Sequence, residues 1–213
     1  MKLSIAVLGL GKFGKKLAES LYAMGSEVLV ADKREEVVRE FAGKSTIAIC
    51  ADLSNEEEVL ALDLKNMDIV VSAMGRSLVA SIMAVTVAKE QGVPLVLAKT
   101  SSDRMTSILK KVGADRILDP EEEGGLRVAQ ILSTSLLDYV EVDENFCIVE
   151  LRARKEWIGK NLIELNLRKN YNMNVVAVKD HNEMWSFADP KIRVKEKNDF
   201  LVALEKKDLK KWK

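Results

Sequence analysis

Three glycines with a fixed spacing are the first candidates for chemistry in this chain. They lie in "VLGLGKFGKKLAESL", between an apolar run and a helical pattern. Gly9 permits a tight turn, Gly11 lets the backbone approach a pyrophosphate, and Gly14 lets the helix lie close against its strand. Phosphates bound there meet the unpaired N–H groups and the positive end of a helix dipole. The motif therefore predicts a site for a phosphate compound.

An acidic residue at the end of the next apolar run supports this interpretation. Asp32 follows Gly14 by eighteen residues, where a carboxylate accepts hydrogen bonds from ribose hydroxyls. Its charge would repel a 2′-phosphate, although the adjacent Lys33 and Arg34 reduce that repulsion. The alternative is that Asp32 caps a helix. Asp52, at the end of the third run, either meets the base edge or is a cap or solvated turn residue.

Lys12 adds a flexible cation where the phosphates would lie. ATP and ADP present more negative charge there than the two bridged phosphates of NAD, so this lysine favours ATP or ADP, with NAD(H) as the alternative. The other interpretation of Lys12 is a solvated lysine on the first helical turn.

The rest of the chain offers little catalytic chemistry. Its one histidine, His181, lies in a polar turn, where a solvated residue is the simpler interpretation. We find no metal-ligand spacing and no Ser-His-Asp or Cys-His arrangement. Cys50 and Cys147 lie in apolar contexts, which predicts buried thiols in a reducing cytoplasm. The sequence predicts a binding protein rather than an enzyme; the alternative is a small NAD(P)-dependent oxidoreductase or redox sensor.

Charge and hydropathy exclude several other classes of function. The 213 residues include 33 lysines and arginines and 33 aspartates and glutamates, so no net positive field recruits nucleic acid or anionic lipid. The N-terminal "MKLSIAVLGLG" is expected to form a first strand and not a signal peptide. The apolar segments are too short or too interrupted to span a bilayer. Any link to a membrane is expected to go through a partner.

The elements that position the glycines and Asp32 follow from the hydropathy pattern. Six apolar runs, "LSIAVLG", "EVLVAD", "TIAICAD", "DIVVSAMG", "VPLVLAK" and "ADRILDP", alternate with helical segments such as 14–24, 56–62 and 78–91. This alternation predicts an α/β fold, a Rossmann-like doubly wound parallel sheet covered on both faces. A further helix, "GGLRVAQILSTSLL", leads out of it. We expect the domain to span residues 1–138.

Residues 139–213 have a different pattern. Shorter strands are expected in "NFCIVELRA", "MNVVAVKD", "MWSFA" and "DFLVALEK", with a short helix around "NLIELN" and a turn at residues 180–182. The pattern predicts a small C-terminal α+β domain.

Several of these stretches together resemble a known family. They are "VLGLGKFGKKLAESLYAMGSEVLVAD", "ADLSNEEEVLAL", "DIVVSAMG", "GADRILDPEEEGGLRVAQIL" and "IGKNLIELNLRKNYNMNVVAVK" with "DFLVAL". Over nearly the whole chain the sequence is similar to the RCK (KTN) family, the cytoplasmic regulatory subunits of bacterial Ktr and Trk potassium uptake systems. The resemblance implies a Rossmann-like N-terminal lobe and a C-terminal lobe of the TrkA-C type. It also implies dimers that assemble into an octameric ring on the inner face of the membrane, where nucleotide exchange gates a potassium channel or transporter.

The resemblance also implies roles for individual residues. Nucleotide contacts are expected from the glycine turn, the ends of the second to fourth strands and the lysine after the fifth: Gly9, Leu10, Gly11, Lys12, Phe13, Gly14, Asp32, Lys33, Asp52, Leu53, Ala73, Met74, Gly75 and Lys99. The loop at 76–78 departs from the family, which often has asparagine there, although Arg76 could itself meet a phosphate.

Two further sites are implied by the same resemblance. Glu121 would help to hold Mg²⁺ or Ca²⁺ beside the ATP phosphates of a neighbouring subunit; from the residues alone, an acidic first helical turn explains it equally well. In some relatives the C-terminal lobe binds cyclic di-AMP, which would involve Asn166, Arg168 and Asn174. The alternative there is a packed helix and strand with a solvated arginine.

Overall fold

The computed structural model describes residues 2–133, 136–180 and 184–212. By its internal contacts the chain divides into two units, Met1–Glu121 and Glu122–Lys213. The sequence analysis expects the boundary at 138/139, whereas the contacts divide the chain earlier. The predicted turn at 180–182, including His181, lies largely outside the described residues.

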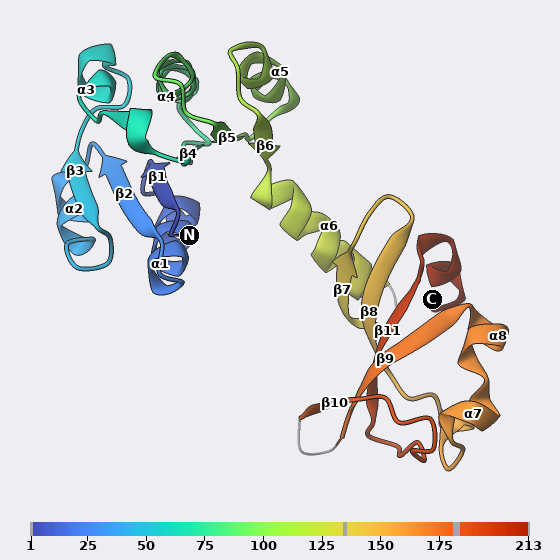
Figure 1. The fold of residues 1–213 in the computed structure, drawn as a ribbon. Coiled ribbons are helices and arrows are strands. Elements are labelled where there is room, and N and C mark those ends of the chain that lie inside the picture. The colour runs from blue at the N-terminus through green and yellow to red at the C-terminus, as the bar shows by residue number, and fades with distance from the viewer. Residues whose placement is uncertain (1, 134–135, 181–183, 213) are drawn as a thin grey trace. The chain divides into compact units, whose positions relative to one another are not determined.

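The first unit is built on a parallel sheet of six strands in the order β3-β2-β1-β4-β5-β6 (Figure 1). The strands are β1 (Ser4–Leu8), β2 (Glu27–Asp32), β3 (Ile47–Cys50), β4 (Ile69–Ser72), β5 (Leu95–Lys99) and β6 (Arg116–Leu118). Every neighbouring pair in the sheet is parallel. These are the six predicted runs, so the predicted doubly wound fold is confirmed.

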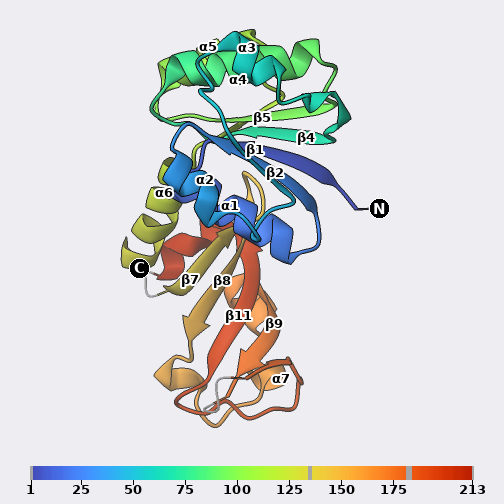
Figure 2. The same ribbon diagram turned by 90° about the vertical axis from the view of Figure 1, so that its left-hand side faces the viewer.

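Helices cover both faces of this sheet, which explains why its central strands are apolar throughout. Helices α1 (Lys12–Ala23) and α2 (Glu35–Glu40) pack on one face. The other face carries α3 (Glu56–Leu60), α4 (Leu78–Glu90) and α5 (Asp103–Lys111), as Figure 2 shows. A short 3-10 turn, η1 (Leu64–Asn66), precedes β4.

The strand order reverses between β1 and β4, which are neighbours in the sheet. The connection from β1 runs through α1 to one side, and the connection from β4 runs through α4 to the other. In doubly wound sheets the ligand site lies outside the carboxyl ends of the strands at this reversal. In this chain the glycine turn after β1 and residues 73–77 after β4 flank that point.

The division between Glu121 and Glu122 lies at the start of helix α6 (Pro120–Ser133), because the rest of this helix makes contacts with the second unit. Ile131 packs against the core of the second unit, and the Arg127 guanidinium donates to the Asp138 carboxylate at 2.8 Å. The helix begins and ends four residues before the predicted segment "GGLRVAQILSTSLL", residues 124–137, and β7 (Leu136–Glu141) begins within that segment. The expected boundary at 138/139 therefore falls inside a strand of the second unit.

The second unit is an antiparallel sheet in the order β10-β9-β11-β8-β7. Its other strands are β8 (Phe146–Arg152), β9 (Met173–Lys179), β10 (Trp185–Phe187) and β11 (Asp199–Glu205). Helices α7 (Leu162–Leu165) and α8 (Leu167–Tyr171) and the turns η2 (Lys155–Trp157) and η3 (Lys206–Trp212) complete it. The prediction of a small α+β domain is confirmed; β7 is a strand that the sequence analysis missed.

Aromatic residues form the centre of the second unit's core. Trp157 lies edge-on to Phe200, Tyr171 and Trp212, with ring centroids 5.6–5.8 Å apart. The Arg154 guanidinium lies 4.0 Å from the centre of the Trp212 ring. Edge-to-face aromatic pairs and a stacked guanidinium both contribute stabilisation beyond that from buried apolar area. This cluster therefore stabilises the packing of η3 against the sheet.

The two cysteines differ in exposure, and the prediction for one of them is wrong. Cys147 is fully buried in β8, as expected. Cys50 is exposed, because it ends β3, which lies at the edge of the sheet. Both thiols are free.

Candidate functional site

A cavity of about 660 Å³ opens at the carboxyl ends of the strands in the first unit. We call it the glycine-turn cavity. It is lined by Gly9, Gly11, Lys12, Phe13, Asp32, Lys33, Arg34, Asp52, Leu53, Ser54, Ala73, Met74, Gly75, Arg76, Ser77, Ala80, Lys99 and Glu121. Its volume lies in the range of small-molecule sites.

The reason why a glycine is needed differs among the three glycines of the motif. Gly9 has a φ of +96°, and a Cβ there would lie 2.5 Å from Met74 Cγ. A Cβ on Gly14 would lie 2.0 Å from the Gly9 carbonyl oxygen, so the start of α1 packs directly on the turn. Gly11, in contrast, has an ordinary φ of −69°, and a Cβ there would have nothing within 4 Å. The fold requires Gly9 and Gly14, whereas the space beside Gly11 is open to a ligand.

The N-terminus of α1 is left available by its sequence. Gly11 is the N-cap, no side chain caps the helix, and its first turn carries no acidic residue. The first-turn N–H groups of a helix lack partners within the helix and carry its positive partial charge. This end of α1 is therefore suited to an anion.

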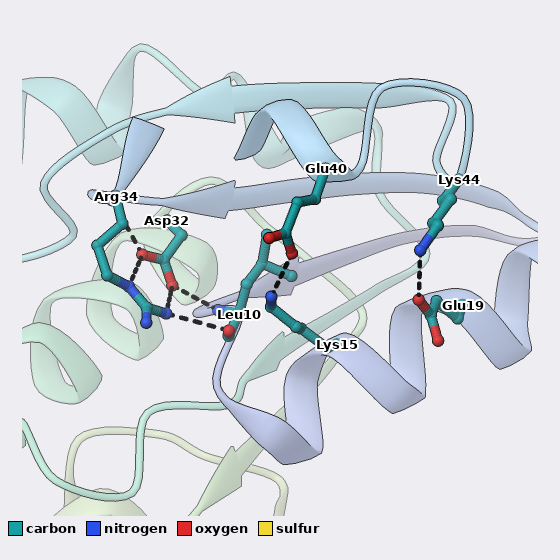
Figure 3. Close-up of polar contacts among 7 residues, drawn as sticks. All are labelled: Leu10, Lys15, Glu19, Asp32, Arg34, Glu40 and Lys44. Atoms are coloured by element: carbon teal, nitrogen blue, oxygen red, sulfur yellow. Dashed lines mark hydrogen bonds and ion pairs between the residues drawn. The ribbon is translucent and has the colours of Figure 1, made fainter. Parts of the chain in front are cut away.

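The Asp32 carboxylate accepts hydrogen bonds from the glycine turn and from Arg34 (Figure 3). Its Oδ2 accepts a hydrogen bond from the Leu10 N–H at 2.7 Å, and its Oδ1 accepts one from the Arg34 N–H at 3.0 Å. The Arg34 side chain adds two more, from Nε to Oδ1 and from Nη2 to Oδ2, each 2.9 Å. Nη2 also donates to the Leu10 carbonyl at 3.0 Å. Asp32 is thus not a helix cap; Arg34 is the N-cap residue of α2.

These contacts fix the charge of Asp32. Burial opposes its ionisation, but the hydrogen bonds from the Arg34 side chain, the Arg34 N–H and the Leu10 N–H outweigh that effect and hold the pKa of Asp32 below its usual value. The carboxylate is therefore ionised at neutral pH, as an acceptor for ribose hydroxyls must be.

Exposed ion pairs hold α1 beside α2. Lys15 pairs with Glu40, and Glu19 pairs with Lys44 in the segment after α2 (Figure 3). Solvent-exposed pairs of this kind contribute little to stability, so we assign them a role in orientation only.

Cations outnumber anions around the cavity, and three of them make no hydrogen bond or ion pair with the residues that the structure describes. In the described part of the chain, no ion pair or hydrogen bond is found for the side chains of Lys12, Lys33 and Arg76. Lys12 and Arg76 are exposed. This excess of positive charge suits a polyanionic ligand.

Lys99 is the buried cation of the site. Its side chain is 8% exposed, and its Nζ donates to Glu121 Oε1 at 2.8 Å. The hydrogen bond from Lys99 lowers the pKa of Glu121. A Cβ on Gly75 would lie 2.7 Å from Lys99 Nζ, so Gly75 makes room for this ammonium group. Glu121, expected to hold a divalent cation, is thus paired with Lys99 within its own chain.

Asp52 has a local role alongside its place in the cavity wall. Its Oδ1 accepts a hydrogen bond from the Ser54 N–H at 2.9 Å, which lowers the pKa of Asp52. The N-cap of α3 is Asn55, not Asp52. One carboxylate oxygen therefore shapes the turn, and the side chain is exposed beside buried Leu53.

Thirteen of the fifteen residues predicted from the sequence line the cavity. The two that do not are Leu10 and Gly14: Leu10 is fully buried and contributes its N–H to Asp32, and Gly14 packs on Gly9. The sequence analysis did not predict Arg34, Ser54, Ser77 and Ala80 as part of the wall. Ser77 could have been found as a helix cap, because its hydroxyl accepts from the Ala80 N–H at the start of α4.

The second unit has a cavity of about 410 Å³, which we call the Asn166 cavity. It is lined by Leu162, Ile163, Asn166, Leu167, Arg168, Met173, Asn174, Val175, Ala188 and Pro190. The three residues implied for cyclic di-AMP, Asn166, Arg168 and Asn174, all lie on it. Asn166 has a φ of +42°, a left-handed conformation that asparagine tolerates better than most residues.

Two further properties bear on the class of protein. In residues 2–133, 136–180 and 184–212, no group of three or more His, Cys, Asp or Glu side chains is arranged to hold a metal ion. The helices of the same ranges include none with the length and apolar character that crossing a membrane requires.

The fold and the cavity define a class: a Rossmann-like domain with a glycine-turn site, followed by a small antiparallel unit. Residues 5–120 match the family model of the TrkA-N domain. Ktr system potassium uptake protein A of Bacillus subtilis (strain 168) is 34% identical over 208 residues, which are 97% of this chain and 94% of that protein. Ktr system potassium uptake protein C of the same organism is 36% identical over 185 residues, or 86% and 84% of the two chains. The chain therefore belongs to the RCK/KTN family of regulatory subunits of Ktr and Trk potassium uptake systems.

Solved structures agree with this fold. The GsuK channel superposes on 99% of this chain with a TM-score of 0.68 at 13% identity. A GsuK channel bound to NAD superposes on 98% with a TM-score of 0.65 at 12% identity. The chain covers 38% of the length of each of these channel proteins. At this level of identity the likeness concerns the fold.

Proposed function

We propose that this chain is a nucleotide-sensing regulatory subunit that gates a membrane potassium channel or transporter. The observation that carries the proposal is the glycine-turn cavity. An uncapped helix N-terminus, open space beside Gly11 and three cations without a hydrogen bond or ion pair to the described residues lie there with an ionised Asp32. Membership of the RCK/KTN family supports the connection to potassium transport.

The preferred ligand in this proposal is ATP or ADP. Lys12 and Arg76 lie on the wall with no partner in the described residues, so their charge is available to the terminal phosphates. NAD(H) spreads less charge over its two bridged phosphates and gains less from these side chains. Glu121 would join Mg²⁺ or Ca²⁺ to the ATP phosphates of a neighbouring subunit, for which it must leave Lys99.

The chain acts in this proposal without catalysing a reaction. The nucleotide changes the arrangement of subunits, and the membrane partner responds to that change. By linkage, ATP and ADP shift such an equilibrium only as far as their affinities for the two arrangements differ. We infer dimers that assemble into an octameric ring at the cytoplasmic face of the membrane.

The Asn166 cavity is the basis for proposing a second ligand. Asn166, Arg168 and Asn174 supply an amide, a guanidinium and a second amide around about 410 Å³ of space. Arginine and amide side chains suit phosphate and base edges, so we infer that this cavity binds cyclic di-AMP.

Native mass spectrometry of the purified chain, followed by potassium flux in liposomes with its membrane partner, tests the proposal. We expect retained adenine nucleotide, an eight-subunit mass, and faster flux with ATP than with ADP. Equal flux with both nucleotides, together with identical solution scattering profiles, would contradict gating. That outcome would favour an oxidoreductase or redox sensor instead.

A further inference from the structure

Asp32 has no acceptor capacity left in this structure. An ionised carboxylate offers about four lone-pair positions. Two are taken by the N–H groups of Leu10 and Arg34, and two by Nε and Nη2 of the Arg34 side chain. The carboxylate that is expected to select a ribose 2′-hydroxyl is therefore occupied by a residue of its own chain.

The two kinds of contact differ in how easily a ligand can replace them. The backbone bonds are part of the turn after β1 and the start of α2, so they hold Asp32 in place. The Arg34 side chain is 47% exposed, whereas that of Asp32 is 9% exposed. A bound nucleotide thus meets a guanidinium at the ribose edge of the cavity, with the carboxylate behind it.

Arg34 also changes the charge at this edge. A carboxylate alone repels a phosphate on the ribose 2′ carbon, and a bidentate arginine neutralises it. Nη1 of Arg34 makes no hydrogen bond to any described residue, and Lys33 lies on the same wall, where its side chain makes no hydrogen bond or ion pair with a described residue. Guanidinium and ammonium donors are the groups that bind phosphate monoesters in proteins.

We propose that Arg34 determines the selectivity of the glycine-turn cavity at the ribose 2′ position, so that the site accepts an adenine nucleotide carrying a 2′-phosphate. The inference rests on the proposed nucleotide site. Arg34 holds Asp32 and presents Nη1 to the phosphate. Without Arg34 the site becomes selective for a free 2′-hydroxyl.

The test compares two ligands that differ only by the 2′-phosphate, AMP and adenosine 2′,5′-bisphosphate, with adenosine 3′,5′-bisphosphate as the control for charge. Affinities are measured by calorimetry on the full chain and on Arg34→Ala. We expect wild type to bind the 2′,5′-bisphosphate within about tenfold of AMP, and Arg34→Ala to weaken it by about tenfold or more, the range of a charge-assisted hydrogen bond. AMP is expected to bind Arg34→Ala as tightly as wild type or more tightly, because Asp32 is then free to accept from the ribose.

Two control variants test whether the effect of Arg34→Ala is specific to Arg34. Arg39→Ala removes the same charge from α2 at a residue that pairs with Glu35 and does not line the cavity, so we expect it to change neither affinity. Arg34→Lys keeps the positive charge but not the planar pair of guanidinium donors, so we expect an intermediate loss of affinity for the 2′,5′-bisphosphate.

A 2′,5′-bisphosphate affinity that changes less than about twofold in Arg34→Ala, or equally in Arg39→Ala, would overturn the assignment. The same holds if the 3′,5′ isomer loses as much as the 2′,5′ isomer. If ADP itself gives no binding to wild type, the proposed nucleotide site fails, and this inference fails with it.

Discussion

At the scale of single residues, Lys12 and Arg34 are two of the solvent-exposed cations of the glycine-turn cavity, and they differ in whether they have a partner. Arg34 is bonded to Asp32, whereas Lys12 has no partner in the described residues. A free cation adds most to the binding of the ligand that brings the most negative charge. Lys12 is therefore the residue at which ATP and ADP are expected to be distinguished.

Lys12→Ala should weaken ATP binding by about tenfold more than ADP binding, since one charge-assisted contact to the terminal phosphate is lost. Calorimetry with both nucleotides measures the difference. Lys16→Ala, an exposed lysine of the same helix that does not line the cavity, is the matched control. Equal losses of ATP and ADP affinity in Lys12→Ala would remove Lys12 from the terminal phosphate.

Glu121→Gln should abolish the strengthening of ATP binding by Mg²⁺ or Ca²⁺, while binding without metal stays nearly unchanged. The reason is that an amide is a far weaker ligand for a hard cation than a carboxylate. Glu123→Gln removes the same charge from an exposed position of α6 and should leave the metal effect intact. An undiminished metal effect in Glu121→Gln would show that Glu121 does not hold the cation.

At the scale of elements, the sequence predicted what depends on local pattern. The four inner strands of the first unit, β2, β1, β4 and β5, are largely buried between the helices on the two faces, and all six strands appear as apolar runs between helical segments. Strand β7 was missed because its apolar residues continue the pattern of α6 and its register with β8 shifts between Leu136 and Asp138. Arg34 was recognised as a charge near Asp32, but its bonds to both carboxylate oxygens depend on side-chain geometry that spacing does not give.

Strand β7 also carries a group that makes the second unit sensitive to alkaline pH. Tyr139 is 6% exposed, and its hydroxyl donates to Glu141 Oε2 at 3.3 Å. Burial, with the nearby Cys147 and Glu141, raises the pKa of Tyr139 to about 12 from an ordinary 10.0. Above pH 10 the unfolded tyrosine therefore ionises first, and the folded state loses stability as the pH rises towards 12.

Tyr139→Phe should reduce the loss of stability between pH 9 and pH 11 by about 1 kcal/mol. Denaturant unfolding followed by tryptophan fluorescence measures it, because all three tryptophans, Trp157, Trp185 and Trp212, lie in the second unit. Tyr22→Phe, at an exposed tyrosine of the first unit, is the control. The same pH dependence in Tyr139→Phe and wild type would contradict a raised pKa for Tyr139.

At the scale of the whole molecule, the glycine-turn cavity and the Asn166 cavity belong to different units of one chain. The first unit has the features of a nucleotide site, and the second has the polar groups for a further ligand. A regulatory subunit needs such sites to respond to ligands, and it needs no reaction at either. The account therefore depends on nucleotide binding at the glycine turn.

Gly11 allows that binding to be tested without disturbing the fold. Its φ of −69° is allowed for alanine, and an added Cβ meets no atom within 4 Å. Alanine is a poorer N-cap residue than glycine, so the substitution is expected to cost roughly 0.5–1 kcal/mol of stability, which leaves the fold intact. The alanine methyl group would occupy the space through which a pyrophosphate approaches the backbone, so it should weaken nucleotide binding.

The most direct measurement is calorimetric titration of ADP into wild type and Gly11→Ala, with the melting temperature of each recorded alongside. The account predicts one ADP per chain for wild type and an affinity at least tenfold lower for Gly11→Ala, about 1.4 kcal/mol. Without ligand, the melting temperature of Gly11→Ala should be lower by only about 2–4 °C. Equal ADP affinity in the two proteins, or no binding to wild type, would contradict a nucleotide site at the glycine turn.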